Sequence, residues 1–178
     1  MIQSPLASVG RLLMTGFTDE QLRFIGEMAV VWNSNEKVFE RLIWRIANWG
    51  SDEGALVTTD LGNVSKETLA RNLAYLNLKS ATCFDFVIAT IDFHTELRIR
   101  RNNLLHSLPI TQSSEAATKA EKRSAKKGQG TITTTNHDAS VASLEELSRM
   151  LALGFLALTT ADSQVYLSSN PRRIGRCR

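Results

Sequence analysis

The pattern of hydrophobic and polar positions predicts a long helix near the start of the chain. Between Thr18 and Gly50, apolar residues recur about every 3.6 positions, as they do on the buried face of a helix. Thr18 and Gln21 have the spacing of a capping box, and Gly50 is typical of the position just after a helix end. Two interpretations stay open at the polar residues 33–35, a kink in this helix or a break that splits it into two. We interpret the tryptophans as core residues: Trp32, Trp44 and Trp49.

Three further helices are expected. The stretch 50–64 is rich in Gly, Asp and Thr, and we interpret it as a loop with a short extended piece at ALVTT. The second helix starts with Ser65 as its N-cap, the third covers about 79–107, and the last starts with Ser143 as its N-cap. The inward face of the second helix is expected to carry Leu69, Leu73 and Leu76.

The segment 115–140 interrupts this helical pattern, because it is polar and rich in Thr and Lys. Two interpretations stay open, a disordered linker and a β-hairpin in which AEKRSAKK and TITTTNH flank a GQG turn. We favour the hairpin, since its turn is short and its arms match in length. The sequence therefore predicts an all-α fold, a bundle of about four helices with a small β-hairpin insertion. It is expected to form one domain over 1–178, with flexible tails at 1–17 and 170–178.

Composition narrows the classes of protein. Hydrophobic residues make up 43% of the chain and charged residues 22%, as in an ordinary globular domain. The net charge of +3 permits contact with nucleic acid without requiring it. The only cysteines, Cys83 and Cys177, lack ligand spacing, so we expect no disulfide framework, metal site or other cofactor. We also expect no membrane span, because no run of about 18 apolar residues occurs, and a cytoplasmic location.

The segment RIRRNNLLHSLP (98–109) departs from this ordinary pattern. Pro109 cannot continue a helix, which places His106 in the last helical turn, where the helix dipole favours a protonated imidazole. Asn102 and His106 are four residues apart and therefore share one helix face.

Arg101 lies on the same helix in a row of otherwise apolar positions. We expect its guanidinium to be half-buried and to pair with a carboxylate, for which Glu36 is the candidate. The other two histidines are given structural interpretations. His94 is interpreted as an interior or edge histidine with satisfied nitrogens, and His137 as a loop residue.

RNNLLH, from Arg101 to His106, resembles the RN-x3-H form of the R-x4-6-H motif of the HEPN superfamily. These are all-α domains common in bacterial toxins and defence systems. VVWNSNEKVFERL is similar to the W-x-x-x-E helix of one HEPN-like bacterial group, with Trp32 and Glu36 at the motif positions. The likeness extends over about 20–160. One departure lies just after the motif, where that group often has an aromatic residue and this chain has leucine.

The resemblance implies a metal-independent endoribonuclease with a toxin or phage-defence role and an antitoxin or other regulatory protein as partner. It also implies a homodimer in which two motifs face each other across one cleft. Cleaving RNA without metal needs a base, an acid and a cation near the phosphate. His106 would be the acid or base, Arg101 would bind the scissile phosphate, and Asn102 would orient nearby groups. Contacts with the RNA backbone are expected from Arg98, Lys119, Lys122, Arg123, Lys126 and Lys127.

Two other functions stay open. One is a non-catalytic helical dimerisation or interaction module in which Arg101 and His106 are structural. The other is the binding of a small nucleotide by the same basic cleft.

Overall fold

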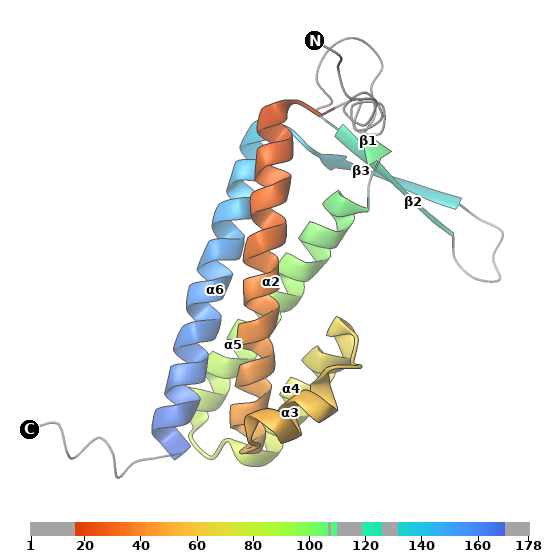
Figure 1. Cartoon of the computed structure of the whole chain (residues 1–178). Helices are drawn as coiled ribbons and strands as arrows, with labels where there is room; N and C mark the ends of the chain where they lie inside the picture. Colours follow the sequence, from red (N-terminus) through yellow and green to blue (C-terminus); the bar gives the residue numbers. More distant parts are fainter. Residues whose placement is uncertain (1–16, 107, 110–118, 126–131, 170–178) are drawn as a thin grey trace, which may run out of the picture. The chain divides into compact units, whose positions relative to one another are not determined.

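A computed structural model describes residues 17–106, 108–109, 119–125 and 132–169 (Figure 1). Its described part contains five helices and three short strands, so the fold is all-α in class. None of these helices is long and apolar enough to cross a membrane. Almost all of both predicted tails lies outside the described residues.

The chain divides into two compact units. The first unit comprises Met1–Ala29 and Ile99–Ser148, and the second comprises Val30–Arg98 and Arg149–Arg178. The single domain expected from the sequence stays a prediction.

Helix α2 (Asp19–Ala47) confirms the predicted first helix and its capping box. Thr18 N donates to Gln21 Oε1 at 2.7 Å, and Gln21 N donates to Thr18 Oγ1 at 3.2 Å. The helix runs unbroken through the polar stretch but ends before the predicted stop at Gly50. Asn48 instead takes the left-handed conformation after the last turn, with a φ of 56°. Asparagine tolerates this region better than most residues because its short polar side chain bonds locally.

Helix α3 (Ser51–Thr58) lies where a loop was predicted, so that interpretation was wrong. Gly50 is the N-cap of this helix, and its backbone N–H donates to Glu53 Oε2 at 3.1 Å. Gly54 is buried against the Trp44 indole, where an added Cβ would overlap the ring. The short helix is therefore stabilised by its first-turn acids and by close packing.

Helix α4 (Asn63–Asn77) begins two residues before Ser65, the predicted N-cap. Its predicted apolar face is also wrong in part, because Leu76 is 63% exposed. The residues that this helix buries are Lys66, Glu67, Ala70 and Ala74. Alanines let the helix backbone approach its neighbours closely, and the two charged residues require partners there.

Helix α5 (Ala81–Leu105) confirms the third predicted helix, and Val87 and Ile91 on it are part of the core. Helix α6 (Val141–Ser169) is the last helix, but its N-cap is Ser140 rather than the predicted Ser143. The backbone N–H of Ser143 donates to Ser140 Oγ at 3.3 Å.

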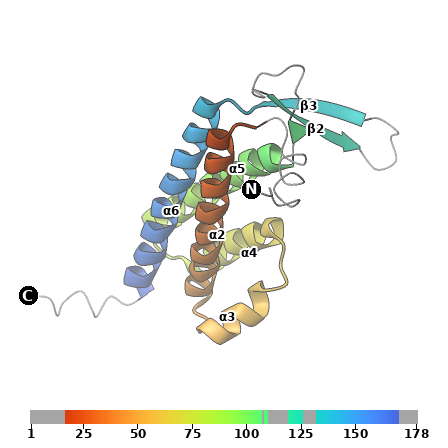
Figure 2. The ribbon, with the colours of Figure 1, turned by 45° about the horizontal axis from the view of Figure 1, so that its top comes forward.

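The core of the second unit lies where its parts of α2, α4, α5 and α6 meet (Figures 1 and 2). Asn35 on α2 donates through Nδ2 to the Leu151 carbonyl at 3.1 Å, and Arg41 Nε lies 3.1 Å from Asp162 Oδ2. The contacts advance in the same direction along both helices, so α2 and α6 run parallel here. Large, fully buried residues of this unit include Trp32, Phe39, Leu42, Ile43, Ile91 and Leu158.

The first unit contains a three-stranded antiparallel sheet. Its strands β1 (Leu108–Pro109), β2 (Lys119–Ala125) and β3 (Ile132–Asp138) are in the order β1-β2-β3. Strands β2 and β3 lie where the arms of the hairpin were predicted, whereas the GQG turn falls outside the described residues. Gln21 Nε2 donates to the Ala139 carbonyl at 2.7 Å, which joins the first turn of α2 to the end of β3.

Candidate functional site

The predicted catalytic residues lie at the C-terminal end of α5, in the first unit, with His106 directly after the last helical residue. The helical hydrogen bond from His106 N to the Asn102 carbonyl measures 3.0 Å, so the helical backbone continues through the whole motif. The His106 side chain is exposed, whereas Arg101 and Asn102 are half-buried. The structure therefore brings an accessible imidazole and a partly shielded guanidinium to one helix end.

A hydrogen bond joins the first two residues of the motif. Arg101 Nη1 donates to Asn102 Oδ1 at 2.8 Å. Because a guanidinium carries five N–H donors, this bond orients the group without exhausting its capacity. The role predicted for Asn102 in catalysis stays a prediction.

Glu36, the predicted partner of Arg101, has a different contact within the second unit. Its Oε1 accepts a hydrogen bond from Asn63 Nδ2 at 2.5 Å. The pairing with Arg101 stays a prediction.

The residues predicted to contact the RNA backbone fall into three groups. Lys119, Lys122 and Arg123 lie in β2, where Lys122 is opposite Thr135 in the register. Lys126 and Lys127 lie outside the described residues. Among these residues, Arg98 has side-chain contacts that the structure describes. Its guanidinium binds a carboxylate within the second unit, to which Arg98 also belongs.

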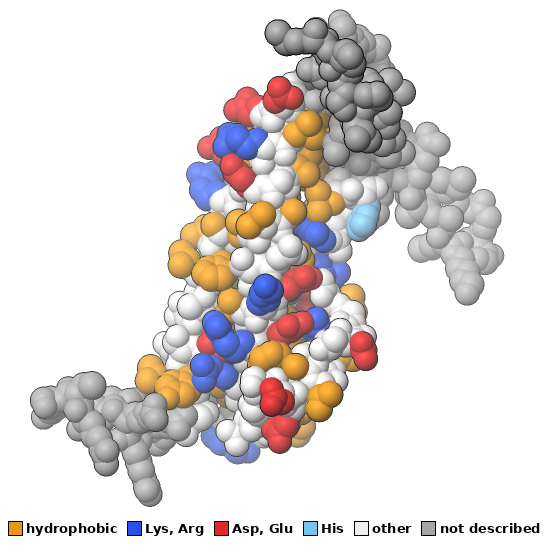
Figure 3. Space-filling model, viewed as in Figure 1, with side chains coloured by type: hydrophobic (Ala, Val, Ile, Leu, Met, Phe, Trp, Pro, Cys, Tyr) orange, Lys and Arg blue, Asp and Glu red, His pale blue; other side chains and the backbone are white. Residues whose placement is uncertain are grey.

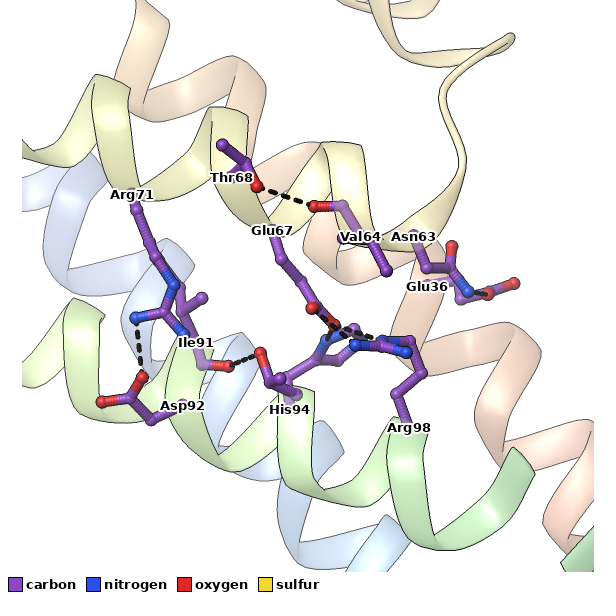
Figure 4. A network of polar contacts seen from close by, with 11 residues as sticks. Glu36, Asn63, Val64, Glu67, Thr68, Arg71, Ile91, Asp92, His94 and Arg98 are labelled. Atoms are coloured by element: carbon purple, nitrogen blue, oxygen red, sulfur yellow. Dashed lines mark hydrogen bonds and ion pairs between the residues drawn. The ribbon is translucent and has the colours of Figure 1, made fainter. Parts of the chain in front are cut away.

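That carboxylate is Glu67 on α4, which points between two residues of α5 (Figure 4). Arg98 Nε lies 2.7 Å from Glu67 Oε1, and Arg98 Nη2 lies 3.0 Å from Oε2. The pair is bidentate, the strongest common geometry between these groups, and both side chains are largely buried. The third member is His94, whose Nδ1 lies 3.5 Å from Glu67 Oε1, too far for a well-formed hydrogen bond. We call Glu67, His94 and Arg98 the buried charge cluster.

His94 lies between two aromatic rings of α2. Its ring centroid is 4.9 Å from that of Trp32 and 4.3 Å from that of Phe39, and both pairs are stacked. The histidine is only 2% exposed, so its interior position is confirmed. The prediction of satisfied nitrogens was wrong, since neither nitrogen has a well-formed hydrogen bond within the described part of the chain.

The environment of Glu67 controls its protonation. Burial alone raises the pKa of its carboxyl. The contacts with His94 and Arg98, together with the Arg98 charge, outweigh burial and lower the pKa from the ordinary 4.5 to about 2. The carboxylate is therefore ionised at any physiological pH.

Further ion pairs surround the cluster. Lys66 pairs with Glu40 on α2, and Arg71 Nη1 lies 2.6 Å from Asp92 Oδ1 on α5. These contacts link α4 to α2 and α5, so the cluster stabilises the second unit. Sequence reasoning missed it because Glu67 is 27 and 31 residues from its partners, and nothing in the pattern specifies that pairing.

A second polar feature lies in the first unit and is called the polar cavity below. It has a volume of about 180 Å³, and its walls come from α5, β3 and α6. The lining residues are Arg100, Asn103, Leu104, His137, Asp138, Ser143 and Leu147. His137 was predicted to be a loop residue but lies in β3, so that interpretation was wrong.

Among the described residues, no group of three or more His, Cys, Asp or Glu side chains is placed to hold a metal ion. No protein-family model, no curated protein and no solved structure matches this chain. The HEPN-like resemblance therefore stays an expectation from the sequence.

Proposed function

We propose that this chain is a metal-independent endoribonuclease of HEPN-like architecture, with an active site built from the α5 ends of two copies. The observation that supports it best is the joint state of the motif residues. His106 is exposed, and Arg101 is oriented by its 2.8 Å bond to Asn102. A purely structural role for these residues would favour a buried histidine bonded within the protein.

The proposed reaction is a transfer of the phosphate within the RNA. The 2′-oxygen bonds to phosphorus, the bond from phosphorus to the 5′-oxygen breaks, and a cyclic phosphate and a 5′-hydroxyl result. One imidazole accepts the proton of the 2′-hydroxyl, and a second, protonated imidazole donates a proton to the leaving 5′-oxygen. Arg101 stabilises the negative charge that develops on the phosphorane.

A second copy is needed because this reaction requires two imidazoles and the motif carries one. His137 does not supply the second imidazole, because its side chain lines the polar cavity together with Arg100 and Asn103. An α-helix turns by about 100° per residue. The α5 residues that line the polar cavity therefore lie about 130° around the helix axis from the midpoint between Asn102 and His106. Exposure of His106 leaves it accessible to the same residue of another protomer.

The remaining predicted residues have separate roles in this proposal. Lys119, Lys122, Arg123, Lys126 and Lys127 contact the RNA backbone. Arg98 holds its part of α5 against α4 through Glu67, within the second unit. A toxin or phage-defence role, with a regulatory protein as partner, follows from the resemblance alone.

The first test is cleavage of labelled RNA in EDTA by the wild type and by His106→Ala. Arg23→Ala is the matched control, because it removes an exposed cation from the same unit. We expect cleavage by the wild type and the control, with a cyclic phosphate terminus, and a loss of 10²-fold or more (order of magnitude) in His106→Ala. Equal cleavage by all three proteins would remove His106 from the mechanism.

The composite site predicts a second result when wild type and His106→Ala are mixed and allowed to exchange subunits. If both imidazoles are required, equal mixing leaves about a quarter of the dimers active. Activity that instead falls in proportion to the wild-type fraction would assign the whole site to one chain.

The alternative function is a non-catalytic dimerisation module, favoured by an apolar groove in the second unit. The groove has a volume of about 370 Å³ and lies on α2 and α6, where hydrophobic side chains gather on the surface (Figure 3). Val30 is 68% exposed and Leu156 is 60% exposed, as at a surface that another protein covers. The lining residues are Val30, Val31, Ser34, Ala152, Phe155 and Leu156.

A second copy of the chain is the occupant that this alternative assigns to the groove. Leu156→Lys would then abolish the dimer in light scattering while leaving the fold intact. Absence of RNA cleavage by the wild type, combined with this loss of the dimer, would favour the module over the enzyme.

A further inference from the structure

A row of three cations on α2 is not used by the proposed reaction. Lys37, Arg41 and Arg45 are spaced four residues apart, so they lie on one side of the helix and advance about 6 Å along its axis per step. All three belong to the second unit. Figure 3 shows Lys and Arg side chains, in blue, gathered beside the C-terminal half of α2. We call these three residues the cationic row.

The acidic residues of α2 do not cancel this charge, because they are engaged with α4. Glu40 pairs with Lys66, and Glu36 accepts the hydrogen bond from Asn63. Lys37 is exposed and has no ion-pair partner among the described residues. The carboxylate that does contact the row is Asp162 on α6. Three cations and one carboxylate leave the row with a net positive charge.

Asp162 holds two members of the row by their inner nitrogens. Arg41 Nε donates to Oδ2 at 3.1 Å, and Arg45 Nε lies 2.5 Å from Oδ1 without the alignment of a hydrogen bond. Each guanidinium has four further N–H donors on its two Nη atoms. These Nη atoms have no hydrogen-bond partner within the part of the chain that the structure describes. The Asp162 side chain is only 8% exposed, whereas those of Arg41 and Arg45 are 48% and 36% exposed, so the free donors lie at the surface.

A second contact fixes Arg45. Its guanidinium carbon lies 4.7 Å from the centroid of the Tyr166 ring, within the range of a cation–π interaction. A side chain that is already held in place loses little conformational freedom when it binds a ligand, which favours binding. The two arginines are therefore pre-oriented donors rather than freely moving surface charges.

These donors match the oxygens of phosphate groups. The planar guanidinium binds phosphate in a bidentate manner, which a lysine ammonium does not. The row extends about 12 Å from Lys37 to Arg45, so it suits a chain of phosphates better than a single ion. A flat lipid surface fits less well, because Arg41 and Arg45 bend toward a buried carboxylate instead of projecting from the helix.

We propose that the cationic row binds the phosphate backbone of single-stranded RNA. The Nη groups of Arg41 and Arg45 donate to two neighbouring phosphates, and Lys37 neutralises a third. Asp162 is a positioning residue that fixes both guanidiniums. The choice of RNA among polyanions rests on the proposed ribonuclease function, to which the row adds a substrate-binding surface in the second unit.

The test measures binding of labelled oligouridine by fluorescence anisotropy, in the full-length His106→Ala protein so that cleavage does not interfere. We expect Arg41→Gln/Arg45→Gln to bind about 10–30-fold more weakly at about 0.1 M salt. The plot of log affinity against log salt concentration should become shallower by about 1.4, as for two phosphate contacts of a single strand. Lys79→Gln/Arg149→Gln removes two exposed cations of the same unit and should weaken binding by less than about threefold.

Asp162→Asn separates positioning from charge. This variant makes the protein more positive by one charge, which by itself would strengthen RNA binding. If Asp162 fixes the guanidiniums, the variant should instead bind about threefold more weakly. Circular dichroism checks that each variant folds. Because Arg41→Gln/Arg45→Gln leaves a buried carboxylate without its partners, the same pair combined with Asp162→Asn provides a second form of the test.

Equal losses in the row variant and its control, or no binding of oligouridine, would overturn the proposal. Stronger binding by Asp162→Asn would overturn the positioning role. Binding to phosphatidylserine vesicles that depends on Arg41 and Arg45, without RNA binding, would overturn the RNA assignment in favour of a membrane surface. RNA binding that depends on both arginines, without any cleavage by the wild type, would refute the nuclease and keep the row. Cleavage that continues unchanged after the loss of both arginines would refute the row and keep the nuclease.

Discussion

Replacing Glu67 by glutamine tests whether this carboxylate stabilises the second unit through its charge. Glutamine keeps the shape of the side chain and one acceptor oxygen, so the change removes mainly the ionic part of the contact. Arg98, whose side chain is only 15% exposed, is then left without its bidentate partner.

The expected cost can be estimated in two ways. The pKa of Glu67 falls from 4.5 to about 2 on folding, and about 1.4 kcal/mol per pKa unit makes this worth about 3 kcal/mol at neutral pH. Removing one member of a buried ion pair costs roughly 3–5 kcal/mol, because the other charge stays buried. Both estimates predict a loss of about 3 kcal/mol in the free energy of unfolding.

The sign of the pH dependence follows from the same pKa. The carboxyl binds its proton more weakly in the folded state, so its contribution is fully present above pH 4.5 and is lost as the pH falls toward 2. Glu67→Gln should lack this part of the acid sensitivity, and its stability should converge with that of the wild type at the lower end of the range.

Urea unfolding, followed by tryptophan fluorescence at neutral pH and at several values between pH 4.5 and pH 2, measures both effects. Asp92→Asn is the matched control, because Asp92 pairs with Arg71 at 2.6 Å but is 60% exposed. It should cost less than about 1 kcal/mol. A similar small cost in Glu67→Gln, or an acid-induced loss of stability as steep as in the wild type, would refute this account of the cluster.

Other predictions concern packing, a buried hydrogen bond and the motif. Gly54→Ala should destabilise the chain by about 1–3 kcal/mol in thermal unfolding, since the new methyl group would overlap the Trp44 ring. Gly26→Ala, in open space inside a helix, should instead stabilise it by about 0.5–1 kcal/mol. Thr58→Val should cost about 1–3 kcal/mol in urea unfolding, because the hydroxyl that accepts the Trp44 Nε1–H at 3.1 Å is lost. Arg101→Lys should reduce RNA cleavage by about 10²-fold in single-turnover kinetics, with the dimer unchanged, because lysine lacks the planar guanidinium.

Local features of the fold were predictable from the sequence. The capping box of Thr18 and Gln21 involves residues three apart, so it can be recognised without knowledge of tertiary structure. The end of α2 was less predictable, because Asn48 and Gly50 can both adopt a left-handed conformation. The short helix at Ser51–Thr58 carried a signal in its first-turn acids, but two glycines outweighed it in the prediction.

Long-range features were not predictable from local pattern. Three leucines suggested the inner face of α4, and Leu69 and Leu73 do pack against the core. The most deeply buried positions of this helix are instead Ala70, Ala74 and charged residues whose partners lie on other helices. The position of His106 at the end of α5 followed from one proline, whereas its exposure did not. The polar cavity requires β3 and α6 to meet α5, and no sequence spacing encodes that meeting.

The pairing of α2 with residues far along the chain has a consequence for synthesis. Asn35 binds the Leu151 carbonyl, which is synthesised 116 residues later. Gln21 binds the Ala139 carbonyl, which is synthesised 118 residues later. At about 5–20 residues per second, the part of the α2 surface that α6 covers stays uncovered for roughly 6–23 seconds on the ribosome. Nascent chains should therefore be far more vulnerable to proteolysis and aggregation before α6 emerges than afterwards.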